Sequence, residues 1–270
     1  MRFFWRVFFL FLFLYLLTMG GHIYSPDEEI LFRVTQSLAE HGRLSIEPLL
    51  GFATKQGIDG KQYAQYGVGQ PLLAVPFYYF GKLLAAVFPG GNDPFFIKGI
   101  IQYHDGSMNS VQLRLGVSIF NQVVTSLLCA MLFLFCYRLT GDKTASWMTV
   151  LLFGMGSYAL PHSKPFFMEP LSALLCFSSF FLFYLGLSGQ SLKRTLLAGC
   201  LFAYSLLVRL DNIFMLPGYA VLIFFHNARE SEPGLLNWIR SQSKPVQNKG
   251  KENDDAIEPG ESDVTFSPLH

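Results

Sequence analysis

Long apolar stretches constrain this chain more than any other feature of its sequence. A helix needs roughly 20 apolar residues to cross the hydrocarbon core of a bilayer. The stretches that approach or reach this length are residues 3–19, 112–138, 145–160, 167–187, 195–209 and 213–226, the last two being separated by Asp211 and Asn212. Inside lipid a segment must satisfy its own backbone hydrogen bonds, so these stretches are expected to be helical. The sequence therefore predicts an all-α membrane protein, built as a multi-pass bundle of transmembrane helices.

Composition supports this prediction. Hydrophobic residues make up 51% of the chain and charged residues 14%, whereas soluble proteins carry about 25% charged residues. The net charge of +1 gives no electrostatic basis for binding nucleic acid, so we expect the bilayer and no nucleic-acid partner. Four cysteines lie inside apolar stretches, where they are typical of small buried side chains and not of disulfides or zinc ligands. They are Cys129, Cys136, Cys176 and Cys200.

The first apolar stretch, residues 3–19, is either a membrane span or a cleaved signal peptide. No A-x-A cleavage pattern precedes Gly20, which favours a span. Arg2 and Arg6 flank its amino end, and positive charge of this kind normally stays in the cytoplasm. The chain from Gly21 onward is then expected to lie outside.

The segment 71–88 decides the remaining topology, because it can either cross the membrane or lie flat at its surface. If it lies flat, the cytoplasmic loops carry more Lys and Arg than the short outer loops, as the positive-inside rule requires. Pro76 and the pair Tyr78–Tyr79 also suit an interfacial helix. The flat arrangement predicts an outer loop over residues 21–111, about five later crossings, and a polar, disordered cytoplasmic tail over 227–270.

Within the outer loop the sequence predicts one amphipathic helix over residues 27–41. Its apolar positions fall on one face, and Gly42 is a typical helix stop. These positions are Ile30, Leu31, Val34 and Leu38. Residues 43–70 are rich in Gly, Gln and Tyr and are expected to be loop. The transmembrane region is thus predicted to cover residues 1–226, in the inner or plasma membrane of the cell.

Three consecutive acidic residues open the amphipathic helix, in Ser25-Pro26-Asp27-Glu28-Glu29. Ser25 as N-cap, Pro26 at the first helical position and Glu28 at the third make a capping box. Asp27 and Glu29 also suit the positive end of the helix dipole. The structural explanation suffices for Glu28 and Glu29, whereas Asp27 takes no part in the capping box and is a candidate functional residue.

A further carboxylate, Glu169, lies between two apolar stretches. Carboxylates at the ends of membrane helices are costly unless they face water, protein or a ligand. Asp27 and Glu169 can converge on one outer face, which indicates a catalytic site there. The alternative for Glu169 is a helix start beside Pro170, where a negative charge favours the dipole.

Four basic or titratable side chains are candidates for binding a phosphate group, since guanidinium and ammonium groups stabilise charge on its oxygens. They are Arg209, Lys61, Arg114 and His162. Arg209 ends an apolar arm, and its alternative roles are an ion pair with Asp211 or extension of its charged end to the membrane interface. Lys61 and Arg114 can equally be outer-surface charges, and a lone loop histidine such as His162 often has no special role. The sequence contains no set of metal ligands strong enough to name.

The order of these elements resembles the GT-C class of membrane glycosyltransferases, in particular the branch with protein O-mannosyltransferases and lipid A aminoarabinose transferases. The matching stretches are Tyr24–Glu28, Gly60–Tyr63, Gly69–Leu72, Gln112–Leu115, Arg138–Lys143, His162–Pro170 and Leu207–Asp211. That class is similar in having one span, an outer loop that opens with acidic residues on a helix, interfacial helices, and then a span, an acidic loop and a further span.

This resemblance implies transfer of a sugar from a polyprenyl-phosphate lipid to a hydroxyl group at the outer membrane face, with inversion. The acceptor is a lipid, a glycan or a protein. Asp27 would be the general base, with Glu28 beside it and Glu169 positioning the acceptor. Some members of the class use a divalent metal ion and others do not.

Members of that class usually have more spans and often a soluble domain after them, so the resemblance covers their N-terminal part. Two other hypotheses therefore stay open. One is a non-catalytic membrane protein, either truncated or a partner subunit. The other is a transporter of lipid or solute. Transporters usually place charges near the bilayer midplane and show internal repeats, and this sequence has neither feature.

Overall fold

The computed structural model describes residues 2–21, 23, 25–46, 54–88 and 110–231. Of these residues, 80% are helical and 4% lie in strands, as expected for an all-α protein. The chain divides into two units, residues 1–226 and 227–270, and the description below concerns the first. The predicted disordered tail does not begin at residue 227, because residues 227–231 are helical. The rest of that tail lies outside the described residues, as does Tyr24.

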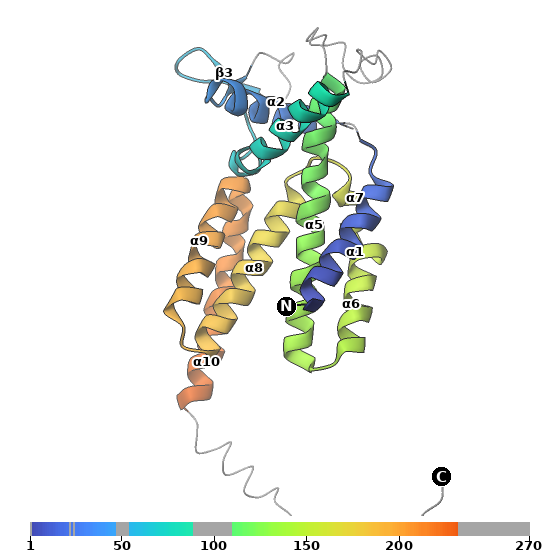
Figure 1. Cartoon of the computed structure of the whole chain (residues 1–270). Coiled ribbons are helices and arrows are strands. Elements are labelled where there is room, and N and C mark those ends of the chain that lie inside the picture. The colour runs from blue at the N-terminus through green and yellow to red at the C-terminus, as the bar shows by residue number, and fades with distance from the viewer. Residues whose placement is uncertain (1, 22, 24, 47–53, 89–109, 232–270) are drawn as a thin grey trace, which may run out of the picture. The chain divides into compact units, whose positions relative to one another are not determined.

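Helices dominate the first unit (Figure 1). Its elements are α1 (Arg2–Thr18), α2 (Pro26–His41), β1 (Ser45–Ile46), β2 (Thr54–Gln56), β3 (Gln62–Ala64), α3 (Gly69–Val87), α5 (Ser110–Thr140), α6 (Lys143–Gly156), α7 (Ala159–Ser163), α8 (Glu169–Ser188), α9 (Leu192–Val208), the 3₁₀ helix η1 (Leu210–Met215) and α10 (Leu216–Ser231).

The long helix α5 is the centre of the bundle (Figure 1). Helices α1 and α6 pack against it on one side and α8 packs against it elsewhere, while α9 packs against α8. Aromatic and aliphatic side chains such as Phe11, Phe133 and Val150 fill the space between α1, α5 and α6. Buried Tyr15 donates a hydrogen bond to the carbonyl of Gly154, at 2.9 Å, and so joins α1 to α6.

Helix α3 runs across one end of the bundle, next to α2 (Figure 1). Two glycines allow it to approach the first turns of α5. A Cβ atom on Gly116 would lie 2.6 Å from the Cα of Gly81, so the two backbones are in direct contact. The core beneath this layer combines Phe32 of α2 and Tyr78 of α3 with apolar side chains of α5 and α8.

The capping signals of the amphipathic helix are confirmed. Ser25 is the N-cap of α2 and accepts a hydrogen bond from the backbone N–H of Glu28. Gly42 ends the helix with φ of 64°, a left-handed conformation that glycine adopts without strain. The apolar face of α2 contributes to two clusters. Leu31 packs in the core shared with α3, α5 and α8, whereas Ile30 packs against the small sheet.

Two predictions about secondary structure were wrong. Residues 43–70 are not simply loop, because their described part contains the three short strands, paired in the order β1-β3-β2, and the start of α3. Residues 145–160 are not one helix, because α6 ends at Gly156 and the short α7 follows. The side chain of Ser157 accepts a hydrogen bond from the backbone of Ala159, as expected where a new turn begins.

Two of the described helices are long and apolar enough to cross a membrane. They are Val111–Thr140 within α5, and α8. This agrees with the predicted bundle at the coarser level of helical architecture and candidate spans. The number of crossings and the orientation of the chain in a membrane belong to the proposal below.

Candidate functional site

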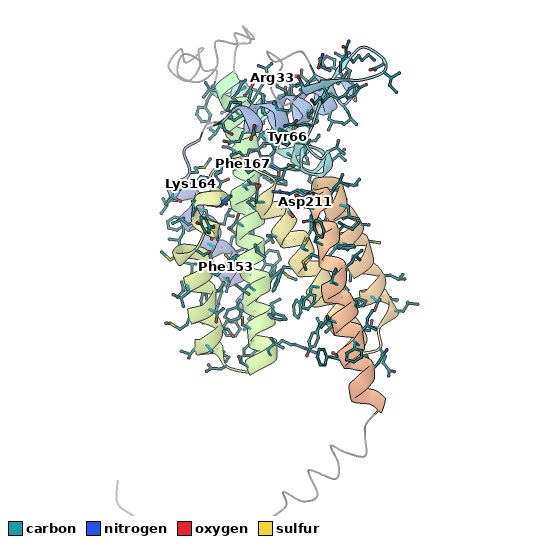
Figure 2. The ribbon with its side chains drawn as sticks, turned by 180° about the vertical axis from the view of Figure 1, so that it is seen from behind. Arg33, Tyr66, Phe153, Lys164, Phe167 and Asp211 are labelled. Atoms are coloured by element: carbon teal, nitrogen blue, oxygen red, sulfur yellow. The ribbon has the colours of Figure 1, made fainter. Side chains whose placement is uncertain are left out.

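The candidate site lies where the outer layer meets the end of the bundle. There the amino end of α2 contacts the loop between α7 and α8, and the turn before α3 contacts the last residues of α9. Figure 2 labels Tyr66, Phe167 and Asp211, which all lie at this end. Asp27 and Glu28 on α2 thus belong to the same region as Glu169, which lies far along the sequence.

Glu28 joins α2 to this loop. Its side chain is fully buried. One carboxylate oxygen accepts a hydrogen bond from the hydroxyl of Ser25 at 3.0 Å, and the other accepts from the backbone N–H of Phe166 at 2.7 Å. The capping-box prediction for Glu28 was therefore incomplete, because the carboxylate also makes a contact 138 residues along the chain.

Two buried amides hold the same loop from other elements. Gln70 of α3 donates a hydrogen bond to the carbonyl of Phe166 at 3.1 Å. Asn121 of α5 donates to the carbonyl of Phe167 at 2.8 Å and also to that of Pro165. Both amide side chains are fully buried. We refer to Glu28, Gln70 and Asn121 together as the loop clamp.

Asp27 remains partly exposed at the start of α2. Burial and a hydrogen bond to Asp27 both raise the pKa of Tyr66 above its ordinary value. Tyr66 is itself fixed, because Gly67 follows it against α9, where a Cβ atom would lie 2.2 Å from the carbonyl oxygen of Val208. The turn that follows Tyr66 thus packs against the end of α9.

Glu169 begins α8 and pairs with Arg209, at the end of α9. The second nitrogen of Arg209 lies 3.1 Å from the carboxylate of Asp211. The Asp211 ion pair that the sequence left as an alternative is thus present, and Glu169 is an additional partner. Next to this group, Asn212 accepts a hydrogen bond from Ser172 at 2.7 Å and so fixes η1 against α8.

Arg114 has a structural role. Its guanidinium contacts both carboxylate oxygens of Glu29, at 2.9 and 2.6 Å, and stacks over the ring of Phe32. Arg33 contacts the same carboxylate at 2.8 Å. Arg114 is a weaker candidate for binding phosphate than Arg209, because its side chain is less exposed, at 20% against 34%.

The other two candidates for binding phosphate are Lys61 and His162. No described contact links either of them to Asp27 or Glu169. Lys61 lies in the β2–β3 hairpin, 3.6 Å from the carboxylate of Asp59, and is well exposed. His162 lies in α7, where its ring meets that of Tyr158 edge to face. Its Nδ1 atom is buried without a hydrogen-bond partner among the described residues.

Sequence reasoning missed Tyr66, Gln70 and Asn121. Asn121 carried a signal, because an amide inside an otherwise apolar stretch must find a partner or is expensive to bury. Gln70 and Tyr66 had no such signal, since both occur in a polar stretch. Among the described residues no group of three His, Cys, Asp or Glu side chains is placed to hold a metal ion.

The site therefore offers a partly exposed carboxylate, Asp27, and an ion pair between exposed Glu169 and half-buried Arg209. A carboxylate can take a proton from a hydroxyl group, and a guanidinium can stabilise an anionic oxygen. Comparison with protein-family models, curated proteins and solved structures found no match to this chain.

Proposed function

We propose that this protein is a multi-pass membrane glycosyltransferase that moves a sugar from a polyprenyl-phosphate donor to a hydroxyl acceptor at the outer membrane face. The observation that carries the proposal is the contact between Glu28 and the N–H of Phe166. It joins the helix that bears Asp27 to the loop that leads into Glu169. Two carboxylates that the resemblance assigns to one active site are thus in neighbouring segments.

The proposed reaction is a single displacement. The acceptor oxygen bonds to the anomeric carbon of the sugar while the bond from that carbon to the phosphate oxygen breaks. The phosphate leaves with the electron pair, and the proton of the acceptor hydroxyl passes to the carboxylate of Asp27. Attack from the face opposite the leaving group inverts the anomeric configuration.

Three of the groups described above have roles in this scheme. Tyr66, whose pKa is raised by burial and by the neighbouring Asp27, orients that carboxylate. Arg209 faces the negative charge that develops on the leaving phosphate, where a fixed cation contributes most to catalysis. Glu169 holds Arg209 in place and is near enough to the surface to meet an acceptor.

The proposed location is the cell membrane, with the N-terminus in the cytoplasm and the α2–α3 layer outside. The apolar helices α5 and α8 support a membrane location. The position of α3 across the end of the bundle supports the flat arrangement of residues 71–88 (Figure 1).

The test is transfer by the full chain in proteoliposomes that contain polyprenyl-phosphate-linked hexose or pentose. Release of free polyprenyl phosphate is measured with lipid, glycan or peptide acceptors. Asp27→Asn removes the base and should lower the rate by about 10²–10⁴-fold. Asp59→Asn, a matched change in the exposed hairpin, should leave the rate unchanged.

Full activity of the Asp27→Asn variant would contradict the assigned base. If the folded wild-type chain releases no polyprenyl phosphate from any donor, the proposed transfer activity itself is contradicted. That result would favour the alternative of a non-catalytic membrane subunit.

A further inference from the structure

The loop clamp fixes more of the α7–α8 loop than a simple chain reversal requires. The carbonyls of Pro165, Phe166 and Phe167 all accept side-chain hydrogen bonds, and the N–H of Phe166 donates one. The clamp residues belong to α2, α3 and α5. Burying a carboxylate and two amides is costly unless they are paired. The amide NH₂ groups are paired here, whereas the oxygens Gln70 Oε1 and Asn121 Oδ1 have no hydrogen-bond partner among the described residues.

The fixed loop leads directly into the ion pair at the proposed site. Glu169 is the third residue after Phe166 and the first residue of α8. Its carboxylate contacts Arg209, whose neighbour Val208 packs against the turn that follows Tyr66. An unbroken series of contacts therefore runs from Glu28 on α2 through the loop to the cation.

We infer that Glu28, Gln70 and Asn121 are positioning residues, which set the place of Glu169 and Arg209 relative to Asp27. The functional part of this inference rests on the proposed glycosyl transfer. It also reassigns Glu28, which touches protein on both oxygens and acts through the loop. Misplacement of a catalytic group by about 1 Å can lower a rate by about 10²-fold, so a rigid loop matters here.

Glu28 provides a sharp distinction between positioning and catalysis. A positioning role needs only an acceptor for the N–H of Phe166, and a glutamine side-chain oxygen is one. The glutamine NH₂ can then donate to the hydroxyl oxygen of Ser25. Glu28→Gln should therefore keep the loop in place, whereas Glu28→Ala should release it.

The first readout is hydrogen exchange at the Phe166 amide in the full chain, followed by mass spectrometry. Loss of a hydrogen bond to a charged acceptor should speed exchange about tenfold or more. We expect this acceleration in Glu28→Ala and not in Glu28→Gln. Unchanged exchange in Glu28→Ala would overturn the inference, whatever the activity of the protein.

The second readout is release of polyprenyl phosphate, with kcat separated from KM. Gln70→Glu and Asn121→Asp place oxygens against the loop carbonyls, and each should lower kcat about 10²-fold with little change in KM. Gln190→Glu, at an exposed position in the turn after α8, is the matched control and should have no effect.

The two readouts separate the two ideas. If the Glu28→Gln variant is inactive while its Phe166 amide stays protected from exchange, Glu28 is a catalytic group. That result would overturn the positioning role. A wild-type chain without transfer activity would count against the proposed function, and exchange at Phe166 would then decide the clamp alone.

Discussion

At the scale of single residues, three adjacent acids have three different environments. Successive side chains on a helix are about 100° apart, since 3.6 residues make one turn. Asp27 therefore lies near Tyr66, whose pKa it raises, whereas Glu28 contacts the α7–α8 loop and Glu29 contacts Arg114. Two of these acids stabilise the structure, and only Asp27 is left with an exposed surface for chemistry.

The pair of buried Glu29 and partly buried Arg114 should contribute to stability. Arg114→Ala should lower the free energy of unfolding by about 1.5–3 kcal/mol, because it removes charged hydrogen bonds from a buried carboxylate that keeps Arg33 as a partner. Arg43→Ala, at an exposed position after α2, should change it by less than about 0.5 kcal/mol. Thermal unfolding in detergent measures both. Equal stability of the two variants would show that Arg33 alone satisfies Glu29.

At the scale of elements, the outer layer is joined by a small polar group. The hydroxyl of Tyr78 on α3 donates to the carboxylate of Glu40 on α2, and the ammonium of Lys82 lies 3.1 Å from the same oxygen. Burial opposes ionisation of Glu40, but these two partners outweigh it and lower the pKa of Glu40 below 4.5. The contacts therefore favour its ionised form.

This pKa shift makes the attachment of α2 dependent on pH. A group whose pKa is lowered by folding stabilises the protein above its unfolded pKa, and the effect is lost as pH falls through the folded value. Wild type should thus exceed Glu40→Gln in stability at about pH 7, and the difference should shrink below about pH 4.5. Unfolding of both proteins across this range tests the prediction. A difference that is constant with pH would contradict it.

The contact of α3 with α5 depends on two glycines. Gly116→Ala puts a methyl group 2.6 Å from the Cα of Gly81, so the backbones must separate. Overpacking of this kind should cost about 1–3 kcal/mol in the free energy of unfolding. Gly199→Ala in α9 meets nothing within 4 Å, and it should stabilise by about 0.5–1 kcal/mol through its helix propensity. Equal destabilisation by both changes would mean that close packing is not the cause.

At the scale of the first unit, the α2–α3 layer and the amino end of α8 lie at one end of the bundle, and the α5–α6 turn lies at the other (Figure 1). If α5 crosses a membrane, these two ends are on opposite sides. The acids of the proposed site are then all on one side.

Labelling with a membrane-impermeant maleimide tests this arrangement. The three variants are Lys61→Cys, Lys164→Cys and Lys143→Cys, each in a chain whose native cysteines are replaced by alanine. Positions 61 and 164 should react in intact cells, and position 143 only after permeabilisation, because α5 separates them. Reaction of positions 61 and 164 from opposite sides would separate Asp27 from Glu169 and contradict the proposed active site.

The sequence by itself determined the helices and caps that form through interactions between neighbouring residues. Apolar stretches form helices wherever they occur, and the cap residues Ser25 and Gly42 act on their own backbone neighbours. The break after Gly156 and the strands within 43–70 were not predicted, because short elements depend on what packs against them. The candidate site was predicted only as a list of charged residues.

Only the tertiary structure decided which of these residues meet. The contact of Glu28 with Phe166 spans 138 residues, and that of Asn121 with Phe167 depends on the packing of α5 beside α8. Arg114, a candidate for phosphate binding by its type, is committed to Glu29. The physical reason is that the sequence identifies which side chains are charged or carry an amide. Which partner each of them contacts depends on the burial and geometry of the folded bundle.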